Sequence, residues 1–246
     1  MSATEPDGSA VVRVLSYNVR SLRDEVPALA RVIRACRPDV VCVQEAPRFF
    51  RWRKAAARLA KASGLVYVTG GATASGPMIL SSLRAHVERA EDVLLPRTPG
   101  LHQRGFATAV LRFGRARLGV LSCHLSIDDE ERYEQGRLLL DRLAALDVPY
   151  AVAAGDLNDR PDGRTFQLLA GSLQDGWATK PWGREHTTRL GDPLQRIDAV
   201  FATHGVQVLG CGVPMGLPGI RERDLRAATD HLPVLAAVRV PAGPAA

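Results

Sequence analysis

Apolar runs and amphipathic segments alternate in the first quarter of the chain. Residues 11–17 form a short apolar-rich run, and residues 26–36 repeat apolar side chains at helical spacing. The continuous apolar run at 40–43 is typical of a buried strand. Residues 49–62 return to helical spacing, with Phe49 on the apolar side. This part of the chain is therefore predicted to fold as strand, helix, strand and helix.

The hydrophobic pattern then changes to short apolar segments separated by turn residues. Segments of four to nine residues between Gly, Pro and polar clusters are typical of strands joined by tight connections. This region is therefore predicted to be mostly antiparallel. Its strands are expected at 65–69, 78–81, 86–94, 106–113 and 118–124.

Helices and strands alternate again in the second half. Residues 128–146 and 163–170 have helical spacing, and residues 176–195 form a long irregular loop. Many strands with helices at both ends of the chain predict an α+β fold, in which helices cover two packed mixed sheets. The remaining strands are expected at 148–154, 196–202, 206–211 and 232–240.

The length and composition fit one compact unit. A chain of 246 residues with 46% hydrophobic residues can bury a sizeable core, and no linker or repeat divides it. Residues 11–240 are predicted to form a single domain, and residues 1–10 and 241–246 are expected to be disordered tails. The sequence shows no signal-peptide pattern and no long apolar run, so we expect a cytoplasmic protein without a membrane span.

Charge and cysteine content change this picture little. The net charge is +6, but all but three of the 32 basic residues are arginine, in a chain also rich in Ala, Gly and Pro. Such a bias is typical of a G+C-rich genome, so basicity alone gives only modest support for a polyanionic partner. The four cysteines share no CxxC spacing and are predicted to be buried free thiols: Cys36, Cys42, Cys123 and Cys211.

Polar residues recur at the ends of the apolar runs. In the clearest case, Asp156 and Asn158 follow the run at 150–154 and would present an acceptor and a donor at the rim of a sheet, where ligands often bind. Each residue of this kind also has a structural explanation as a turn residue, a helix-start acid or a packed histidine. The candidate site comprises Asn18, Glu45, His124, Asp156, Asn158, Asp198, Asp230 and His231.

These residue types favour a divalent metal with oxygen ligands. Mg²⁺ and Mn²⁺ accept one or two carboxylates together with waters and phosphate oxygens. An EF-hand is excluded because Arg160 and Pro161 occupy positions that a calcium loop needs for a ligand and for Gly. Since no dinucleotide-binding fingerprint, P-loop or Gly-x-Ser-x-Gly elbow is present, nucleotide-cofactor and serine-hydrolase chemistry is not expected.

Six short motifs occur in order along nearly the whole chain: Ser16-Tyr17-Asn18-Val19-Arg20, Val43-Gln44-Glu45, Ser122-Cys123-His124-Leu125, Gly155-Asp156-Leu157-Asn158-Asp159, Arg196-Ile197-Asp198-Ala199-Val200-Phe201 and Thr229-Asp230-His231-Leu232-Pro233-Val234. Together they resemble the motifs of the endonuclease/exonuclease/phosphatase superfamily. The resemblance implies the family fold, a four-layer α/β/β/α sandwich. It also implies hydrolysis of a phosphate ester with Mg²⁺ or Mn²⁺.

The resemblance further implies which residues hold the metal and the attacking water. Glu45 would be the main metal ligand, assisted by Asn18 and Asp230 through direct or water-mediated contacts. Asp156 would orient or deprotonate the water, and Asn158 would donate to a non-bridging phosphate oxygen.

Two histidines would complete the chemistry. Asp198 would hold His231 in one tautomer and raise its pKa, so that His231 contacts the phosphate or takes part in proton transfer. His124 would stabilise the pentacovalent state or protonate the leaving group. The resemblance leaves open which of these groups is the general base.

Departures from better-known branches bear on the substrate. Arg20 and Arg48 stand near positions where abasic-site endonucleases of the exonuclease III type usually carry other residue types, which disfavours abasic-site repair. The Ser-Cys-His-Leu and Gly-Asp-Leu-Asn-Asp-Arg-Pro forms look more like the branch of sphingomyelinases, inositol-phosphate phosphatases, deadenylase-like nucleases and bacterial phosphodiesterases. A phosphodiesterase or nuclease, with DNA or RNA as a possible substrate, is therefore predicted. The alternatives are a phosphomonoesterase of a small metabolite and a non-catalytic nucleic-acid-binding module.

Substrate selection is expected in loops 70–77, 96–104, 176–195 and 214–228.

Overall fold

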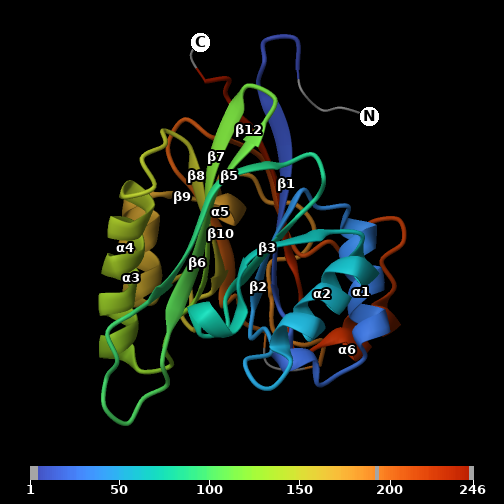
Figure 1. Cartoon of the computed structure of the whole chain (residues 1–246), viewed down its shortest axis with the longest axis vertical. Coiled ribbons are helices and arrows are strands. Elements are labelled where there is room, and N and C mark those ends of the chain that lie inside the picture. Colours follow the sequence, from blue (N-terminus) through green and yellow to red (C-terminus); the bar gives the residue numbers. More distant parts are fainter. Residues whose placement is uncertain (1–4, 192–193, 244–246) are drawn as a thin grey trace.

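Two six-stranded sheets form the centre of the protein (Figure 1). The computed structural model describes residues 5–191 and 194–243. The first sheet has the order β11 (Gln207–Gly212), β12 (Val234–Val240), β1 (Ala10–Asn18), β2 (Val40–Gln44), β4 (Met78–Ser81) and β3 (Val66–Gly70). The second has the order β5 (His86–Leu94), β6 (Gly105–Phe113), β7 (Ala116–His124), β8 (Ala151–Asp156), β10 (Asp198–Ala202) and β9 (Gln174–Asp175).

Helices cover the outer face of each sheet and complete four layers (Figure 1). The first sheet packs against α1 (Val26–Cys36), α2 (Trp52–Ser63) and α6 (Glu222–Ala228), and the second against α3 (Asp129–Ala144) and α4 (Arg164–Ser172). Three short helical segments remain: α5 (Gly176–Thr179) and the 3₁₀ turns η1 (Arg20–Leu22) and η2 (Gly71–Ala74). The predicted four-layer α/β/β/α sandwich of mixed sheets is therefore confirmed.

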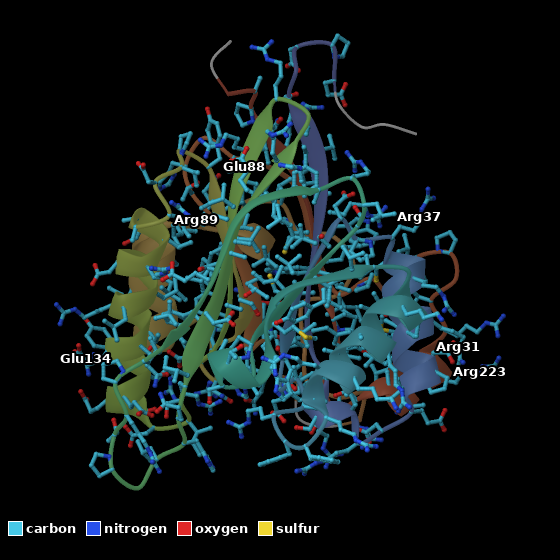
Figure 2. The ribbon with its side chains drawn as sticks, in the orientation of Figure 1. Arg31, Arg37, Glu88, Arg89, Glu134 and Arg223 are labelled. Carbon is cyan, nitrogen blue, oxygen red and sulfur yellow. The ribbon has the colours of Figure 1, made fainter. Side chains whose placement is uncertain are left out.

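The interior follows from the apolar pattern of the strands. Small and branched side chains from both sheets, including Val14, Val40 and Ala109, fill the space between them. On the outer side, α1 buries the stripe that its helical spacing predicts, and Pro27 in its first turn has the backbone angle that a helix start needs. Figure 2 shows the opposite behaviour for charged side chains such as Arg31 on α1, which point away from the body.

Each sheet contains one parallel strand pair, and these pairs position the polar residues. β1 pairs in parallel with β2, and β7 pairs in parallel with β8, whereas the other pairings are antiparallel. Parallel strands end at the same edge, so residues at the carboxyl ends of β1 and β2 are neighbours, as are those of β7 and β8. β1 lies between β2 and β12, and Ser16 pairs with Val234.

Several predicted boundaries differ from the structure at the ends of the chain. Ala10 already belongs to β1 and pairs with Val240, and the amide of Glu5 donates to the Ser9 carbonyl in a turn. Of the expected tail at 1–10, Ala10 therefore belongs to the sheet, and residues 5–9 form a hydrogen-bonded turn that leads into it. Residues 1–4 and 244–246 of the two predicted tails lie outside the described residues, as do residues 192–193 of the loop predicted at 176–195.

Two predicted elements and two predicted loops also differ from the structure. α2 begins at Trp52 rather than Phe49, because Arg51 adopts a left-handed conformation (φ 60°) and leaves Phe49 78% exposed. β8 begins at Ala151, so the predicted strand at 148–154 is three residues shorter at its start. Two loops contain helices that the sequence did not predict: α5 within 176–195 and α6 within 214–228.

The cysteines are free and buried, as predicted. Burial raises the pKa of Cys36, Cys42 and Cys211 to about 12 in each case. These thiols therefore remain protonated at neutral pH. Among the helices in the described part of the chain, none is long and apolar enough to cross a membrane.

Candidate active site

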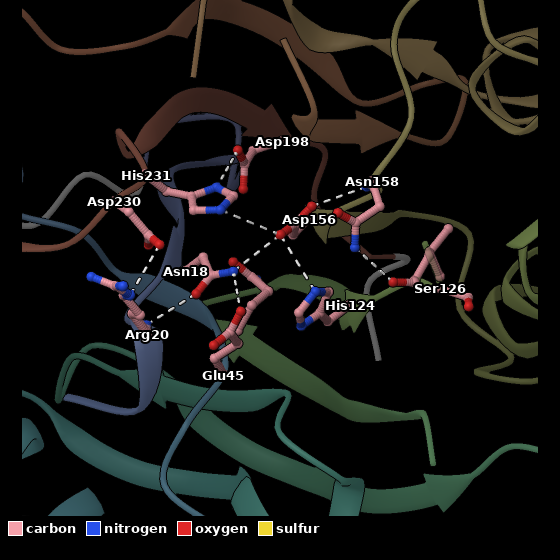
Figure 3. Close-up of polar contacts among 12 residues, drawn as sticks. Asn18, Arg20, Glu45, His124, Ser126, Asp156, Asn158, Asp198, Asp230 and His231 are labelled. Atoms are coloured by element: carbon pink, nitrogen blue, oxygen red, sulfur yellow. Dashed lines mark hydrogen bonds and ion pairs between the residues drawn. The ribbon is translucent and has the colours of Figure 1, made fainter. Parts of the chain in front are cut away.

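The predicted polar residues meet at one edge of the sandwich, between the two sheets (Figure 3). Asn18, His124 and Asp156 are the last residues of β1, β7 and β8, and Asp198 is the first residue of β10. The remaining members lie close to strand ends: Glu45 directly follows β2, Asn158 lies two residues after β8, and Asp230 and His231 lie shortly before β12. Strand register therefore brings together residues that are more than 200 positions apart in the sequence.

Asp156 is the centre of this arrangement. Its Oδ2 accepts a hydrogen bond from Asn18 Nδ2 (3.0 Å) and lies 3.5 Å from His124 Nε2 and 3.7 Å from His231 Nε2. Its Oδ1 accepts from the backbone amide of Asn158 (3.0 Å). The side chain is almost completely buried, with 2% exposed. One carboxylate thus joins a residue of the first sheet to two histidines and to the loop after β8.

Asp198 and His231 form a second contact behind Asp156. His231 Nδ1 lies 2.9 Å from Asp198 Oδ2, which fixes the imidazole ring and places its Nε2 toward Asp156. The backbone amide of Asp198 donates to Thr187 Oγ1 (3.1 Å). Asp198 Oδ1 is buried and has no hydrogen-bond partner within the described residues. The predicted pairing of Asp198 with His231 is therefore present.

Burial and neighbouring charges separate the pKa values of these groups. Burial lowers the pKa of His124 to about 4, although Asp156 opposes the shift. Burial also lowers the pKa of His231, but the charge and hydrogen bond of Asp198, with Asp156 and Asp230, outweigh it and raise that pKa to about 10. Burial and the nearby Asp198 raise the pKa of Asp156. At neutral pH, His124 is therefore neutral and His231 is protonated.

Glu45 lies on the other side of Asn18. Asn18 Nδ2 donates to Glu45 Oε1 (3.1 Å) as well as to Asp156, so one amide links the two carboxylates. Glu45 has a left-handed backbone (φ 52°), and its carbonyl accepts from the amide of Ser21 (2.8 Å). The carboxylate is only partly buried, so it is held at the base of an accessible depression.

Among the described side-chain contacts, Asp230 reaches this group through Arg20. Arg20 Nε lies 3.1 Å from Asp230 Oδ2, and the Arg20 amide donates to Asn18 Oδ1 (3.0 Å). Asp230 is therefore paired with a guanidinium. The sequence placed it beside Glu45 and gave no sign of this ion pair.

Gly155 permits the close contact between β7 and β8 next to the site. A Cβ at this position would lie 2.1 Å from the Cys123 carbonyl oxygen and 2.6 Å from its sulfur. The strand pairing that places Asp156 beside His124 therefore needs glycine at position 155. Beyond the strand, Asn158 has a left-handed backbone (φ 50°), and its Nδ2 donates to the Leu125 carbonyl (2.9 Å).

One group of described residues has the composition of a metal site. Ligand atoms of Asp156, Asp198 and His231 lie within 4.8 Å of one another. Its closest pair, His231 Nδ1 and Asp198 Oδ2, is already joined by the hydrogen bond that fixes the ring. Glu45 is a separate carboxylate, toward which Asn18 presents its Nδ2 donor, while Asn18 Oδ1 accepts from the Arg20 amide.

Sequence reasoning missed the basic wall of the site. A pocket of about 190 Å³ reaches Glu45 and His124 and is lined on its far side by Arg48, His102 and Arg104. Burial lowers the pKa of Arg104, and the charges of Asp156 and Glu45 oppose that shift. The arginine stands at the end of the loop predicted at 96–104. In the sequence, the position of Arg104 next to the start of a strand was the only indication that it belongs to the site.

The described geometry agrees with sequence and structural comparisons. Residues 15–231 match the family described as Endonuclease/Exonuclease/phosphatase family, a range that contains all eight predicted site residues. The chain belongs to the endonuclease/exonuclease/phosphatase family. Members of this family hydrolyse phosphate esters, so this family membership gives the broad reaction class. No curated protein matches the chain significantly.

Solved structures share the family fold over almost the whole chain. An endonuclease/exonuclease/phosphatase from Bacteroides vulgatus superposes with a TM-score of 0.79 at 17% identity, covering 94% of this chain and 99% of that one. A mannosyl-6-phosphatase from Bacteroides thetaiotaomicron has a TM-score of 0.75 at 19% identity, with 92% and 99% covered. A family member from Beutenbergia cavernae is 26% identical, with a TM-score of 0.69 and coverage of 96% and 73%. The first two likenesses show the fold alone.

Proposed function

We propose that the protein is a divalent-metal-dependent hydrolase of phosphate diesters, with DNA or RNA among the candidate substrates. The observation that carries this proposal is the position of Asp156 Oδ2, within 3.7 Å of His124 Nε2 and His231 Nε2 and hydrogen-bonded to Asn18. A buried carboxylate with a raised pKa is a suitable acceptor for the proton of an attacking water.

The two histidines take different roles in this proposal. His231, whose pKa is raised to about 10, carries a positive charge toward the phosphate and is held in orientation by Asp198. His124, whose pKa is lowered to about 4, is neutral and offers a ring N–H as a hydrogen-bond donor. In the reaction, Asp156 accepts a proton from water as the new P–O bond forms. The bond to the leaving oxygen then breaks, and that oxygen takes up a proton from His231.

Asn158 supports the same phosphate position. Its side-chain amide has two hydrogens, of which one is used by the Leu125 carbonyl. The second hydrogen is available for a non-bridging phosphate oxygen. Its hydrogen bond to Leu125 keeps the amide next to His124, so that both can donate to one phosphate group.

The residues present fit a divalent metal at Glu45. Carboxylate oxygens are preferred ligands of Mg²⁺ and Mn²⁺, and Glu45 is partly exposed at the base of the pocket beside His124. Asn18 Nδ2 orients the Glu45 carboxylate, whereas Asp230 is paired with Arg20 and would reach a metal only on release from that ion pair. A bound metal would polarise the phosphate and balance charge on the leaving oxygen.

Two depressions favour a diester over a monoester. The pocket at Glu45 and His124 lies on one side of the reacting groups. A second depression of about 500 Å³ reaches Asn158 and is also lined by Arg132 and Arg160. A diester has two arms that leave the phosphorus, and each depression can accept one.

The four free buried thiols also support a location in the reducing cytoplasm.

Parallel hydrolysis assays test this function. The purified protein is incubated with Mg²⁺ or Mn²⁺ and plasmid DNA, single-stranded nucleic acid, bis-nitrophenyl phosphate or nitrophenyl phosphate. We expect chelator-sensitive release of nitrophenol from the diester. Faster release from nitrophenyl phosphate would instead support a phosphomonoesterase. Nucleic-acid binding without hydrolysis of any ester would support a non-catalytic module.

Two variants test the assigned residues. Asp156→Asn is expected to lower kcat by about a hundredfold or more without changing the fold, because the amide cannot accept the water's proton. Asp162→Asn, at an exposed acid in the following loop, is the matched control. Glu45→Gln is expected to raise the Mg²⁺ concentration needed for half-maximal activity, with Glu134→Gln on α3 as its control. A normal rate for Asp156→Asn, or an unchanged metal titration for Glu45→Gln, contradicts the corresponding role.

A further inference from the structure

A basic pocket adjoins the reacting groups on the side away from Asp156. Glu45, His124 and Ser21 form its inner end, where it meets the proposed reaction centre. The rest of the lining, which we call the basic pocket, consists of Arg48, Ser75, Gly76, His102 and Arg104. Two guanidinium groups, which remain protonated at any physiological pH, thus face a single carboxylate.

Arg104 has unused donors in this pocket. The residue is half-buried, and its Nε is fully buried with no hydrogen-bond partner in the described part of the chain. The charges of Asp156 and Glu45 act to raise the pKa of Arg104, yet neither carboxylate forms an ion pair with it among the described contacts. The buried Nε is out of reach of a ligand, so the Nη groups of Arg104, which have no partner among the described contacts, are the donors open to an incoming acceptor.

The opposite wall holds Arg48 in a defined position. Arg48 Nη1 donates to Ser75 Oγ (3.2 Å) and lies 3.4 Å from the Ser75 carbonyl oxygen. Ser75 Oγ donates to the Gln103 carbonyl (2.7 Å), and Gln103 Nε2 donates to the carbonyls of Leu95 (2.7 Å) and Arg104 (2.8 Å). This network connects the loops that carry the two arginines. Both sides of the pocket are therefore fixed before a ligand binds.

The place of the pocket distinguishes its ligand from the reacting phosphate. Asp156, Asn158, Asp198 and His231 surround the proposed reaction centre but do not line this pocket. A group seated between Arg48 and Arg104 therefore lies beyond Glu45 and His124. The volume of about 190 Å³ includes the inner end at Glu45 and His124, and the arginine side chains of the outer part are of the kind that binds phosphate oxygens through paired N–H donors.

We propose that the basic pocket binds a second phosphate group of the substrate, one that is not cleaved. The inference rests on the proposed function, because it takes Glu45 and His124 to mark the reacting phosphate. The second phosphate would belong either to the neighbouring nucleotide of a nucleic acid strand or to a small metabolite that carries two phosphates. Arg48 and Arg104 would then decide which phosphate esters are good substrates.

Calorimetric binding to matched ligand pairs tests the proposal. Ca²⁺ replaces the activating metal, because it binds the same oxygen ligands. One pair is thymidine 3′,5′-bisphosphate and thymidine 5′-monophosphate, and the other is fructose 1,6-bisphosphate and fructose 6-phosphate. We expect at least one bisphosphate to bind about tenfold more tightly than its monophosphate, as is typical of charged hydrogen bonds to phosphate. The pair that shows this preference distinguishes a nucleotide from a sugar phosphate as the source.

Arginine variants assign the preference to the pocket. Arg48→Gln and Arg104→Gln should each reduce the preference to about threefold or less, since each removes one set of charged donors. Arg51→Gln, at an exposed residue that stacks on Phe50 outside the pocket, should keep the wild-type preference. Arg48 is exposed, so its variant remains informative even if Arg104→Gln does not fold.

The outcomes separate this inference from the proposed function. A wild-type preference below about twofold for both pairs overturns the second-phosphate site, as does an unchanged preference in both arginine variants. Ester hydrolysis by the same wild-type preparation is measured in parallel with Mg²⁺. Hydrolysis without the preference refutes the pocket and keeps the function. The preference without hydrolysis of any ester refutes the function and keeps the pocket.

Discussion

Replacement of Gly155 by alanine should disturb stability and activity together. The added Cβ would lie 2.1 Å from the Cys123 carbonyl oxygen, where ordinary contact begins at 3.4 Å. Because the obstacle is backbone, β7 and β8 must separate by about 1 Å. Overpacking of this kind costs about 1–3 kcal/mol of unfolding free energy. For a protein of this size, that corresponds to a fall in Tm of about 2–12 °C.

The same displacement moves Asp156 relative to His124, because the two residues are register partners at the ends of these strands. A misplacement of about 1 Å in a reacting constellation can reduce turnover about a hundredfold. Thermal unfolding by circular dichroism and hydrolysis of bis-nitrophenyl phosphate measure the two effects.

Gly171→Ala on α4 is the matched control for this substitution. A Cβ at Gly171 would meet nothing within 4 Å, and alanine is the better helix former by about 1 kcal/mol. The control should therefore keep full activity and a Tm at or above the wild-type value. If Gly155→Ala has both a wild-type Tm and a wild-type rate, the argument from the close strand contact is refuted.

Two further substitutions test contacts around the site. Asp198→Asn should lower kcat about a hundredfold with little change in KM, because an uncharged amide does not stabilise protonated His231 as the carboxylate does. Steady-state kinetics that match the wild type would rule out this role. Asp159→Ala should lower the unfolding free energy by about 1–3 kcal/mol, because Asp159 Oδ2 accepts from the amides of Thr165 (2.9 Å) and Phe166 (3.1 Å) at the start of α4. Urea denaturation measures this loss, and an unchanged midpoint would show that water replaces the carboxylate there.

Much of the fold could be predicted because the apolar pattern is strong where elements are buried on one face. The predicted bounds of α1 and β5 agree with the structure, since turn residues or a left-handed cap mark their ends. α6 was missed because seven residues rich in Arg, Glu and Asp carry too little periodic signal. The predicted start of α2 was wrong because the apolar spacing includes Phe49 in the helix, whereas the left-handed backbone at Arg51 leaves Phe49 outside it and exposed.

The site could be predicted as a set of residues, but of its contacts only the Asp198–His231 pair was expected. Residues at the ends of buried strands converge by topology, which explains why Asn18, Asp156 and His231 meet. Side-chain partners depend on loop conformation, and the sequence gave no sign that Asp230 pairs with Arg20. The basic pocket was missed for the same reason, because its arginines come from separate loops that gain their relation only through tertiary packing.

During synthesis, β1 leaves the ribosome more than 200 residues before β12, its antiparallel neighbour in the middle of the first sheet. Until then, one edge of β1 offers unpaired backbone donors and acceptors to other nascent chains. Such long-range pairing is slow to form and exposes intermediates to aggregation. Asp230 and His231 emerge just before β12. A growing chain therefore gains the closing strand and these two candidate site residues in the same step, so translation that stops earlier yields a protein without either.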